Sequence, residues 1–231
     1  MDPIELMAAA SKRVAPTFLN HEIGSDIESV LYHLTKRLRG EYEELVVISF
    51  QDTYSSVLKY LKSIYKDASE VFKGTYLVSV NPFLEEELNP DIIVKTKDAE
   101  IIAGRAKAAV GAKRNTLFLV LGLDLFGVKY RDELHLMIPA IVRILTKGEN
   151  NNVIILFNTK IFPESTTEMV NSFALNLFKF GVEAQGSDIK RKLTIIRTPF
   201  VQYTLKSWYY TVTPKRIVFL PNKLVPSHAY E

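Results

Sequence analysis

Short apolar runs alternate with amphipathic stretches through the middle of the chain. Four such runs occupy residues 45–50, 75–80, 116–123 and 152–157. They are rich in β-branched and aromatic residues, and none alternates cleanly between apolar and polar positions. Runs of this length and composition are typical of strands that are covered on both faces, as in a parallel sheet.

Helical periodicity fills the intervals between and after these runs. It predicts helices at residues 52–66, 98–112, 131–147 and 165–181. Thr96 or Asp98 is placed to cap the second helix. Pro139 lies inside the third, where a proline kinks or breaks a helix. The fourth opens with a capping-box pattern at Ser165 and closes at Gly181.

The two ends of the chain follow different patterns. The first 40 residues predict two helices, 3–14 and 25–39, joined by a loop around Pro16 and His21. The last 50 predict strands at 190–200, 207–212 and 216–221, with a tight turn at Thr213-Pro214-Lys215 that makes the final pair an antiparallel hairpin.

Strands that alternate with helices imply right-handed crossovers and an α/β fold. We therefore expect a three-layer sandwich with a mainly parallel sheet and antiparallel strands at its C-terminal end. No repeat or linker divides the chain, so residues 1–231 are expected to form a single domain. Its parts are a helical segment at 1–44, a core at 45–221 and a tail at 222–231.

Composition removes several classes of function. The chain has 231 residues, 47% of them hydrophobic and 24% charged, as in an ordinary folded domain. It has no cysteine, which excludes disulfides, thiolate metal sites and cysteine nucleophiles. The four histidines are scattered without a metal-binding spacing, so no metal is expected. No Gly-x-Ser-x-Gly pattern marks a hydrolase nucleophile.

The location of the protein is also an expectation from the sequence. No apolar run reaches the roughly 18–20 residues that span a bilayer. At the N-terminus an acidic residue precedes a short apolar stretch, and Lys12 and Arg13 follow it, which is the reverse of the charge order in a signal peptide. We expect a cytoplasmic protein with no membrane partner.

From Leu45 to Pro221 the order of strands and helices resembles the RecA/KaiC branch of the P-loop ATPases. The chain is also similar to a small archaeal family of uncharacterised proteins with a degenerate KaiC/RecA-like core. If the run at 45–50 is aligned as the first strand, the resemblance places the nucleotide loop on residues 49–56. The family pattern GxxxxGK[ST] then needs glycine where Ser49 and Tyr54 stand and lysine where Ser55 stands. Only Ser56 matches.

These departures are severe in physical terms. The glycines allow positive φ and close approach of the backbone to phosphate, and the lysine offsets phosphate charge. The run at 116–124 resembles the Walker B strand, but Gly122 stands where its aspartate belongs and Asp124 comes two residues later. Asp124 is expected to cap the following loop. Asn81 stands near the position of the catalytic glutamate, and an amide cannot act as a base. The resemblance therefore implies a protein that is not an enzyme and needs no cofactor.

The net charge is +3, and the excess of basic residues lies in the C-terminal part. The candidate nucleic-acid surface consists of Lys190, Arg191, Lys192, Arg197, Lys206, Lys215 and Arg216. Aromatic residues lie between them, among them Tyr203, Trp208 and Tyr209. Single-strand nucleic-acid sites combine cations with stacking aromatics. The structural alternative is a basic sheet whose aromatics face the core and whose lysines protect an edge.

Three hypotheses of function follow. The first is a non-catalytic protein-interaction module that binds another protein or itself, with apolar N-terminal residues (Ile4, Leu6, Met7, Val14, Phe18) as a docking segment. The alternative is a nucleic-acid accessory protein, similar to a recombinase paralogue, that uses the basic C-terminal strands. The third is residual nucleotide binding without hydrolysis through Ser55, Ser56 and Asp124.

Overall fold

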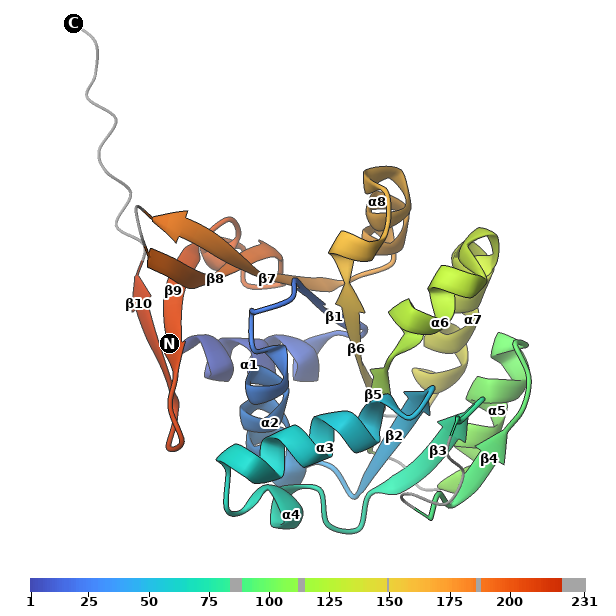
Figure 1. Ribbon diagram of the computed structural model, residues 1–231. Coiled ribbons are helices and arrows are strands. Elements are labelled where there is room, and N and C mark those ends of the chain that lie inside the picture. The colour runs from blue at the N-terminus through green and yellow to red at the C-terminus, as the bar shows by residue number, and fades with distance from the viewer. Residues whose placement is uncertain (84–88, 112–114, 149, 186–187, 222–231) are drawn as a thin grey trace, which may run out of the picture.

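The computed structural model describes residues 1–83, 89–111, 115–148, 150–185 and 188–221. These residues form one ten-stranded sheet (Figure 1) in the order β10-β9-β8-β7-β1-β6-β5-β2-β3-β4. The strands are β1 (Thr17–His21), β2 (Glu44–Phe50), β3 (Tyr76–Val80), β4 (Ile92–Val94), β5 (Thr116–Leu121), β6 (Asn152–Asn158), β7 (Asn176–Gln185), β8 (Asp188–Arg197), β9 (Ser207–Val212) and β10 (Ile217–Pro221).

Helices cover both faces of the parallel part of this sheet. They are α1 (Pro3–Arg13), α2 (Ile27–Leu38), α3 (Thr53–Ile64), α4 (Ala68–Val71), α5 (Ala99–Ala109), α6 (Leu123–Lys129), α7 (Leu134–Leu145) and α8 (Glu164–Ser172). One apolar core joins α1 to α4 with one face of the sheet, and a second joins α5 to α8 with the other face. The result is a three-layer sandwich, as the sequence predicts.

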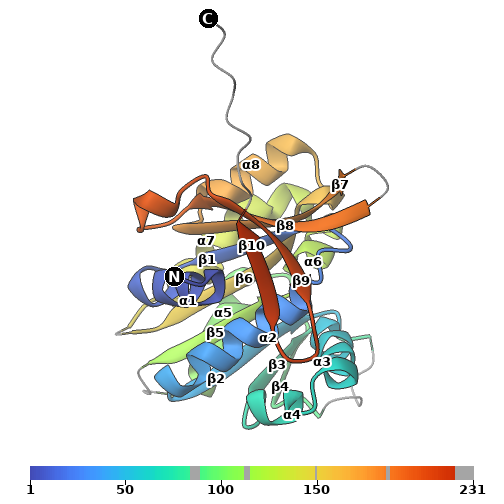
Figure 2. The same ribbon diagram turned by 90° about the vertical axis from the view of Figure 1, so that its left-hand side faces the viewer.

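The direction of the chain explains why each helix lies on its face. From β1 the chain crosses through α2 to β2, and from β6 it crosses through α8 to β7, in the opposite direction along the sheet. Because crossovers are right-handed, connections that run in opposite directions use opposite faces. β8, β9 and β10 add antiparallel to β7, and Figure 2 shows β9 and β10 passing in front of α2.

Several predictions from the pattern are confirmed. The four apolar runs are the parallel, neighbouring strands β2, β3, β5 and β6. β9 and β10 form the predicted hairpin, closed by the Thr213 N–H bond to the Arg216 carbonyl. Of the two candidate caps, Asp98 is the N-cap of α5, and its side chain accepts the backbone N–H groups of Glu100 and Ile101. α7 contains Pro139 and continues beyond it.

Two predictions are wrong. Residues 1–44 are not a purely helical segment, because Thr17–His21 form β1, a central strand between β6 and β7. Residues 165–181 are not one helix, because α8 ends at Ser172 and β7 begins at Asn176. In both stretches burial between neighbouring strands decides the conformation: Leu19, Phe178 and Phe180 are completely buried. The acidic segment 85–87 and the tail 222–231 lie outside the described residues.

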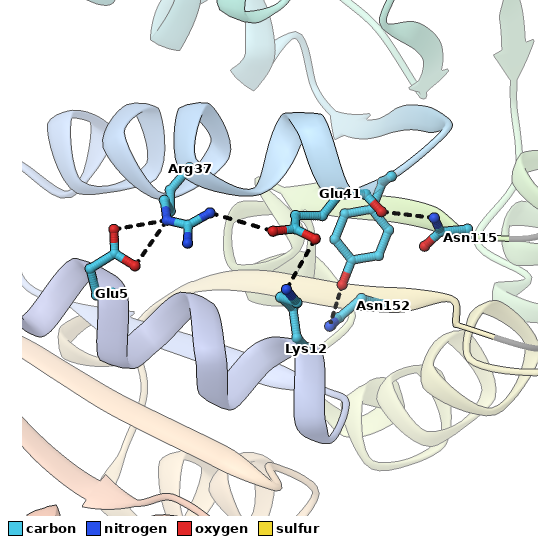
Figure 3. Close-up of polar contacts among 7 residues, drawn as sticks. Glu5, Lys12, Arg37, Glu41, Asn115 and Asn152 are labelled. Atoms are coloured by element: carbon cyan, nitrogen blue, oxygen red, sulfur yellow. Dashed lines mark hydrogen bonds and ion pairs between the residues drawn. The ribbon is translucent and has the colours of Figure 1, made fainter. Parts of the chain in front are cut away.

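A chain of charges links α1 and α2 (Figure 3). The Arg37 guanidinium lies 2.8 Å from Glu5 and 3.5 Å from Glu41, and Glu41 lies 3.0 Å from the Lys12 ammonium. These side chains are well exposed, so each pair adds little stability. Below them, the Asn152 amide donates to the Ser11 carbonyl and to the Tyr42 hydroxyl, both buried contacts. The buried amide, more than the surface charges, fastens α1 to β6.

Within the described residues, no helix is both long enough and apolar enough to cross a bilayer.

Candidate functional site

The carboxyl ends of the parallel strands form the edge at which an α/β sheet usually binds ligands. The favoured place is where neighbouring strands send their connections in opposite directions. β1 and β6 are such neighbours, and so are β2 and β5. The loops that follow these four strands are therefore the candidate site.

The loop after the first strand is not the one that the sequence alignment assumed. The family resemblance places the nucleotide loop after the first strand of the core, and the sequence analysis took residues 45–50 as that strand. That premise is wrong, because β1 precedes β2 and lies at the centre of the sheet. The corresponding loop runs from Glu22 to Asp26, between β1 and α2.

This loop, residues 22–26, contains two carboxylates and no lysine or arginine. The Asp26 carboxylate is nearly buried and accepts hydrogen bonds from the Ser29 hydroxyl at 2.9 Å and the Tyr60 hydroxyl at 2.8 Å. A helix N-terminus attracts an external anion through its free N–H groups and its dipole. At α2 the Asp26 carboxylate lies beside this terminus and adds a negative charge there, although it accepts the two hydroxyl groups and no backbone N–H of the helix.

Two residues of the antiparallel strands hold the same loop from the other side. The Arg191 guanidinium of β8 donates to the Gly24 carbonyl at 3.0 Å and lies 3.6 Å from Asp26. The Tyr210 hydroxyl of β9 donates to the Ser25 carbonyl. Burial raises the pKa of Tyr210, which keeps it a neutral donor. Contacts from β8 and β9 thus hold the loop in place.

The loops after β2 and β5 touch each other. Gln51 and Asp52 both have positive φ, 51° and 57°, which is uncommon for residues other than glycine. Gly122, with φ 75°, approaches so closely that a Cβ there would lie 2.7 Å from the Phe50 carbonyl oxygen. The Thr53 hydroxyl bonds to that same oxygen at 2.6 Å. Protein atoms therefore fill the space between these two strand ends.

Asp124 lies buried in the first turn of α6 beside the ends of β1 and β6. Its Oδ2 accepts the backbone N–H of Asn158 at 3.1 Å, so its described bond joins α6 to β6. Burial raises the pKa of the Asp124 carboxyl, and the nearby His21 opposes that rise. Burial lowers the pKa of His21, and Asp124 opposes that fall. Among the described residues no group of three or more histidines and acids forms a metal site here.

The residues of the expected vestigial loop do not gather around one space. The Ser49 hydroxyl accepts the backbone N–H of Tyr54 at 3.0 Å. The Tyr54 ring packs in the core on the α1–α4 face, with its ring 5.9 Å from that of Phe72. Burial raises the pKa of Tyr54 to about 12. Ser55 is buried and Ser56 is exposed.

The basic C-terminal residues also separate into several places. Arg191 faces the 22–26 loop, whereas Lys190 and Lys192 lie over the Tyr209 ring at 5.7 and 6.0 Å. Arg197 donates to the Ala174 carbonyl, Lys206 lies over Tyr203, and Lys215 and Arg216 belong to the hairpin turn. Tyr210 is buried, and Trp208 and Phe219 pack against the core. The seven cations do not form one continuous surface.

Glu22 and Asp26, which help to define this edge, were not predicted from the sequence, and Arg191 was predicted only as part of a nucleic-acid surface and not as a contact of this loop. One signal was present in the sequence. Gly24-Ser25-Asp26 precedes an amphipathic stretch, which is a typical helix start. No local pattern reveals that Arg191 reaches this loop, because the two are far apart in the chain.

Comparisons with known proteins establish the fold. No family model matches the chain, and no curated protein matches it. Among solved structures it is similar to a KaiC-like protein of the hyperthermophilic archaeon Pyrococcus horikoshii, with a TM-score of 0.65 over 89% of each chain. The sequence identity is 11%, so the likeness concerns the fold alone. The chain has an α/β three-layer sandwich of the RecA/KaiC type, with antiparallel strands at its C-terminal end.

Proposed function

We propose that this RecA/KaiC-like protein does not hydrolyse ATP and works as a protein-interaction module. The 22–26 loop is the observation that carries the proposal. A phosphate placed at the start of α2 would meet the carboxylates of Glu22 and Asp26 and no cation of the loop itself. Two cations from outside the loop are already engaged with it: Arg191 contacts Asp26 and the Gly24 carbonyl, and Lys160 lies 3.4 Å from Glu22. Because a phosphate and these two carboxylates are all negatively charged, their repulsion disfavours phosphate binding at the loop.

The neighbouring strand ends support the same view. Gly122 and Phe50 close the gap between β5 and β2, and Asp124 accepts a backbone N–H instead of facing an open site. Asn81 follows β3, and its amide donates to the Thr96 carbonyl at 2.8 Å. Asp52 accepts the Phe83 N–H at 2.6 Å. The polar groups at this edge thus serve to hold the fold together.

The apolar residues available to a partner are not those of the N-terminal segment. Leu6, Met7 and Phe18 are completely buried, so the expected docking segment is wrong as a surface. Large exposed apolar side chains lie instead on α6 and α7, where Leu125, Val128 and Leu136 are each at least half exposed. Leu136 also lines a groove of about 610 Å³ between the starts of α5 and α7.

The charges around this groove favour a protein partner. Lys97 lies 2.7 Å from Glu133, and Arg143 lies 2.7 Å from Glu100. The rim is therefore neutralised internally and offers no excess charge to an anionic polymer. An apolar floor within a polar rim is the usual arrangement of a protein–protein interface.

Two measurements on the purified protein test the proposal. ATP turnover should stay at the rate of a buffer blank, and light scattering should give a defined oligomer or, with a partner protein, a defined complex. Leu136→Glu should break that assembly by placing a charge in the groove. Ile189→Glu, at another exposed apolar position on β8, is the matched control. ATP turnover above the blank, or an assembly unaffected by Leu136→Glu, would contradict the proposal.

A nucleic-acid surface remains the second candidate, because of Lys190, Lys192 and Tyr209. These residues lie on the antiparallel strands β8 and β9. The α5–α8 core includes no residue of β8, β9 or β10, so the helices α5 to α8 do not cover this part of the sheet. Lys192 and the Tyr209 hydroxyl also contact Glu183, which reduces the local positive charge. If this surface binds single-stranded DNA, the affinity should fall strongly as the salt concentration rises. The double variant Lys190→Glu/Lys192→Glu should abolish binding. The control variant Lys62→Glu on α3 should bind as the wild type does. Fluorescence anisotropy of labelled single-stranded DNA measures this binding. An affinity that does not change with salt, or that is the same in the double variant, would exclude the nucleic-acid surface.

A further inference from the structure

A cavity of about 550 Å³ lies between α8 and the strands β1, β7 and β8. Both views show α8 on the same side of the molecule as β7 and β8 (Figures 1 and 2). The cavity includes residues that directly follow β6, so it lies at the switch point between β1 and β6, on the α8 face of the sheet. Its size is ordinary for a small-molecule site.

Asn20 of β1 is the buried polar group of this cavity. Its side chain is 2% exposed, and its amide nitrogen donates to Asn171 Oδ1 of α8 at 2.6 Å. That bond fixes the orientation of the amide. Asn20 Oδ1 then has no hydrogen-bond partner within the described part of the chain. A buried acceptor without a donor is costly, so the cavity is suited to a ligand that brings an N–H group.

The strand wall of the cavity is basic and the α8 wall is acidic, whereas Lys160, which also lines the cavity, is already paired with Glu22 at 3.4 Å. Lys179 lies beside Asn20 on β7, and Arg197 lies at the end of β8. Glu164 and Glu168 lie on α8 opposite them. Among the described residues neither glutamate nor Lys179 makes an ion pair, so these charges are available. The Arg197 guanidinium donates one bond to the Ala174 carbonyl and keeps further donors.

Between the charged walls the cavity has apolar surface. Phe162 and Leu177 are buried side chains that line it, and Ile196 of β8 lines it at the open side. A ligand that satisfies all these features carries an anion, a cation with N–H donors and an apolar group, and it is small.

We propose that this cavity binds a small zwitterion with an apolar side chain, namely an α-amino acid or a dipeptide. Its carboxylate pairs with Lys179 and Arg197. Its ammonium donates to Asn20 Oδ1 and faces the α8 glutamates, while its side chain packs on Phe162 and Leu177. An inorganic anion can pair only with Lys179 and Arg197, and a simple amine can pair only with the α8 glutamates. The inference is independent of the proposed loss of ATP hydrolysis.

Calorimetric titration of the full chain tests this assignment. L-Leucine and L-leucyl-L-leucine are the probes. Isopentylamine and 4-methylpentanoate are the matched compounds that keep the leucine side chain but lack one charge. The zwitterions should bind at least about tenfold more tightly than either compound, because each compound leaves one charged wall unpaired. Inorganic phosphate serves as the purely anionic comparison.

Variants separate this site from general surface binding. Lys179→Glu should weaken zwitterion binding by about tenfold or more, since it reverses an exposed charge without touching the core. Lys62→Glu on α3 should leave the affinity unchanged. Absence of heat with both zwitterions at millimolar concentration would overturn the proposal. So would phosphate binding as tightly as leucine, or a Lys179→Glu variant with the wild-type affinity.

Discussion

Gly122 lies so close to the end of β2 that a side chain has no room there. A Cβ would lie 2.1 Å from the Thr53 hydroxyl and 2.7 Å from the Phe50 carbonyl, and the residue has φ 75°. We expect Gly122→Ala to lower the free energy of unfolding by about 2 kcal/mol or more, through strain and clash together. Urea unfolding monitored by circular dichroism measures this change.

Gly104 provides the matched control. It lies in α5 with no atom within 4 Å of a built Cβ. Gly104→Ala should therefore leave stability unchanged or raise it by roughly 0.5–1 kcal/mol, since alanine restricts the unfolded chain. Equal effects of the two substitutions would show that the contact between β2 and β5 is not as tight as described.

The half-buried His21 and the buried Asp124 predict a dependence of stability on pH. Burial lowers the pKa of His21 below its ordinary value of 6.5, so the unfolded chain binds the proton first as the pH falls. Stability from this residue is present above about pH 6.5 and is lost as the pH falls through the folded pKa. His21→Gln should thus lose less stability than the wild type between pH 7 and pH 5. The difference can reach about 1.4 kcal/mol per pH unit.

Two further residues contribute to this dependence. His33, whose pKa burial also lowers, should preserve part of the slope in the variant. Asp124 acts with the opposite sign, because its raised pKa favours the folded state at low pH and this is lost as the pH rises. A His21→Gln slope equal to that of the wild type would contradict the burial of the imidazole.

Among the elements, the 22–26 loop depends most on distant parts of the chain. Arg191 supplies both a donor to the Gly24 carbonyl and a cation beside the nearly buried Asp26. Arg191→Ala should lower the free energy of unfolding by about 1–3 kcal/mol, because hydrogen bonds to charged groups contribute that much. Arg105→Ala, an exposed position on α5, should change it by less than about 0.5 kcal/mol. Thermal unfolding of both variants distinguishes the two outcomes, and equal stabilities would mean that Arg191 does not hold the loop.

The sequence predicted some elements well and others poorly for a physical reason. β2, β3, β5 and β6 are buried on both faces, so their continuous apolar runs identify them without tertiary information. β1 is five residues long and ends in Asn20 and His21, so its pattern resembles a loop. In β7, Phe178 and Phe180 alternate with Lys179, which is a strand signal, but the capping-box pattern at Ser165 suggested one long helix.

The candidate site was less predictable than the fold for a related reason. Asp124 was singled out and does lie at the carboxyl edge, but Ser49 and Tyr54 were assigned to it through a strand that is not the first. The residues that fill the edge come from β1, α2, β8 and β9. Their proximity follows from the strand order, which places β1 and β7 side by side, and no short stretch of sequence specifies that order.

At the scale of the whole molecule, the two faces of the sheet are covered to different extents. The α1–α4 core extends to β8, β9 and β10, whereas the α5–α8 core ends at β7. The antiparallel strands therefore fold over one face and hold the 22–26 loop through Arg191 and Tyr210. Under the proposed function, these contacts within the protein order the loop without a nucleotide.

The central proposal is that this edge does not bind nucleotide, and thermal unfolding with and without millimolar Mg-ATP tests it most directly. A ligand at about a hundred times its Kd would stabilise the folded state by about 2.7 kcal/mol and raise the melting temperature by several degrees. We predict the same melting temperature in both samples. A rise with Mg-ATP that is absent with Mg²⁺ alone would contradict the account and assign the edge to nucleotide binding.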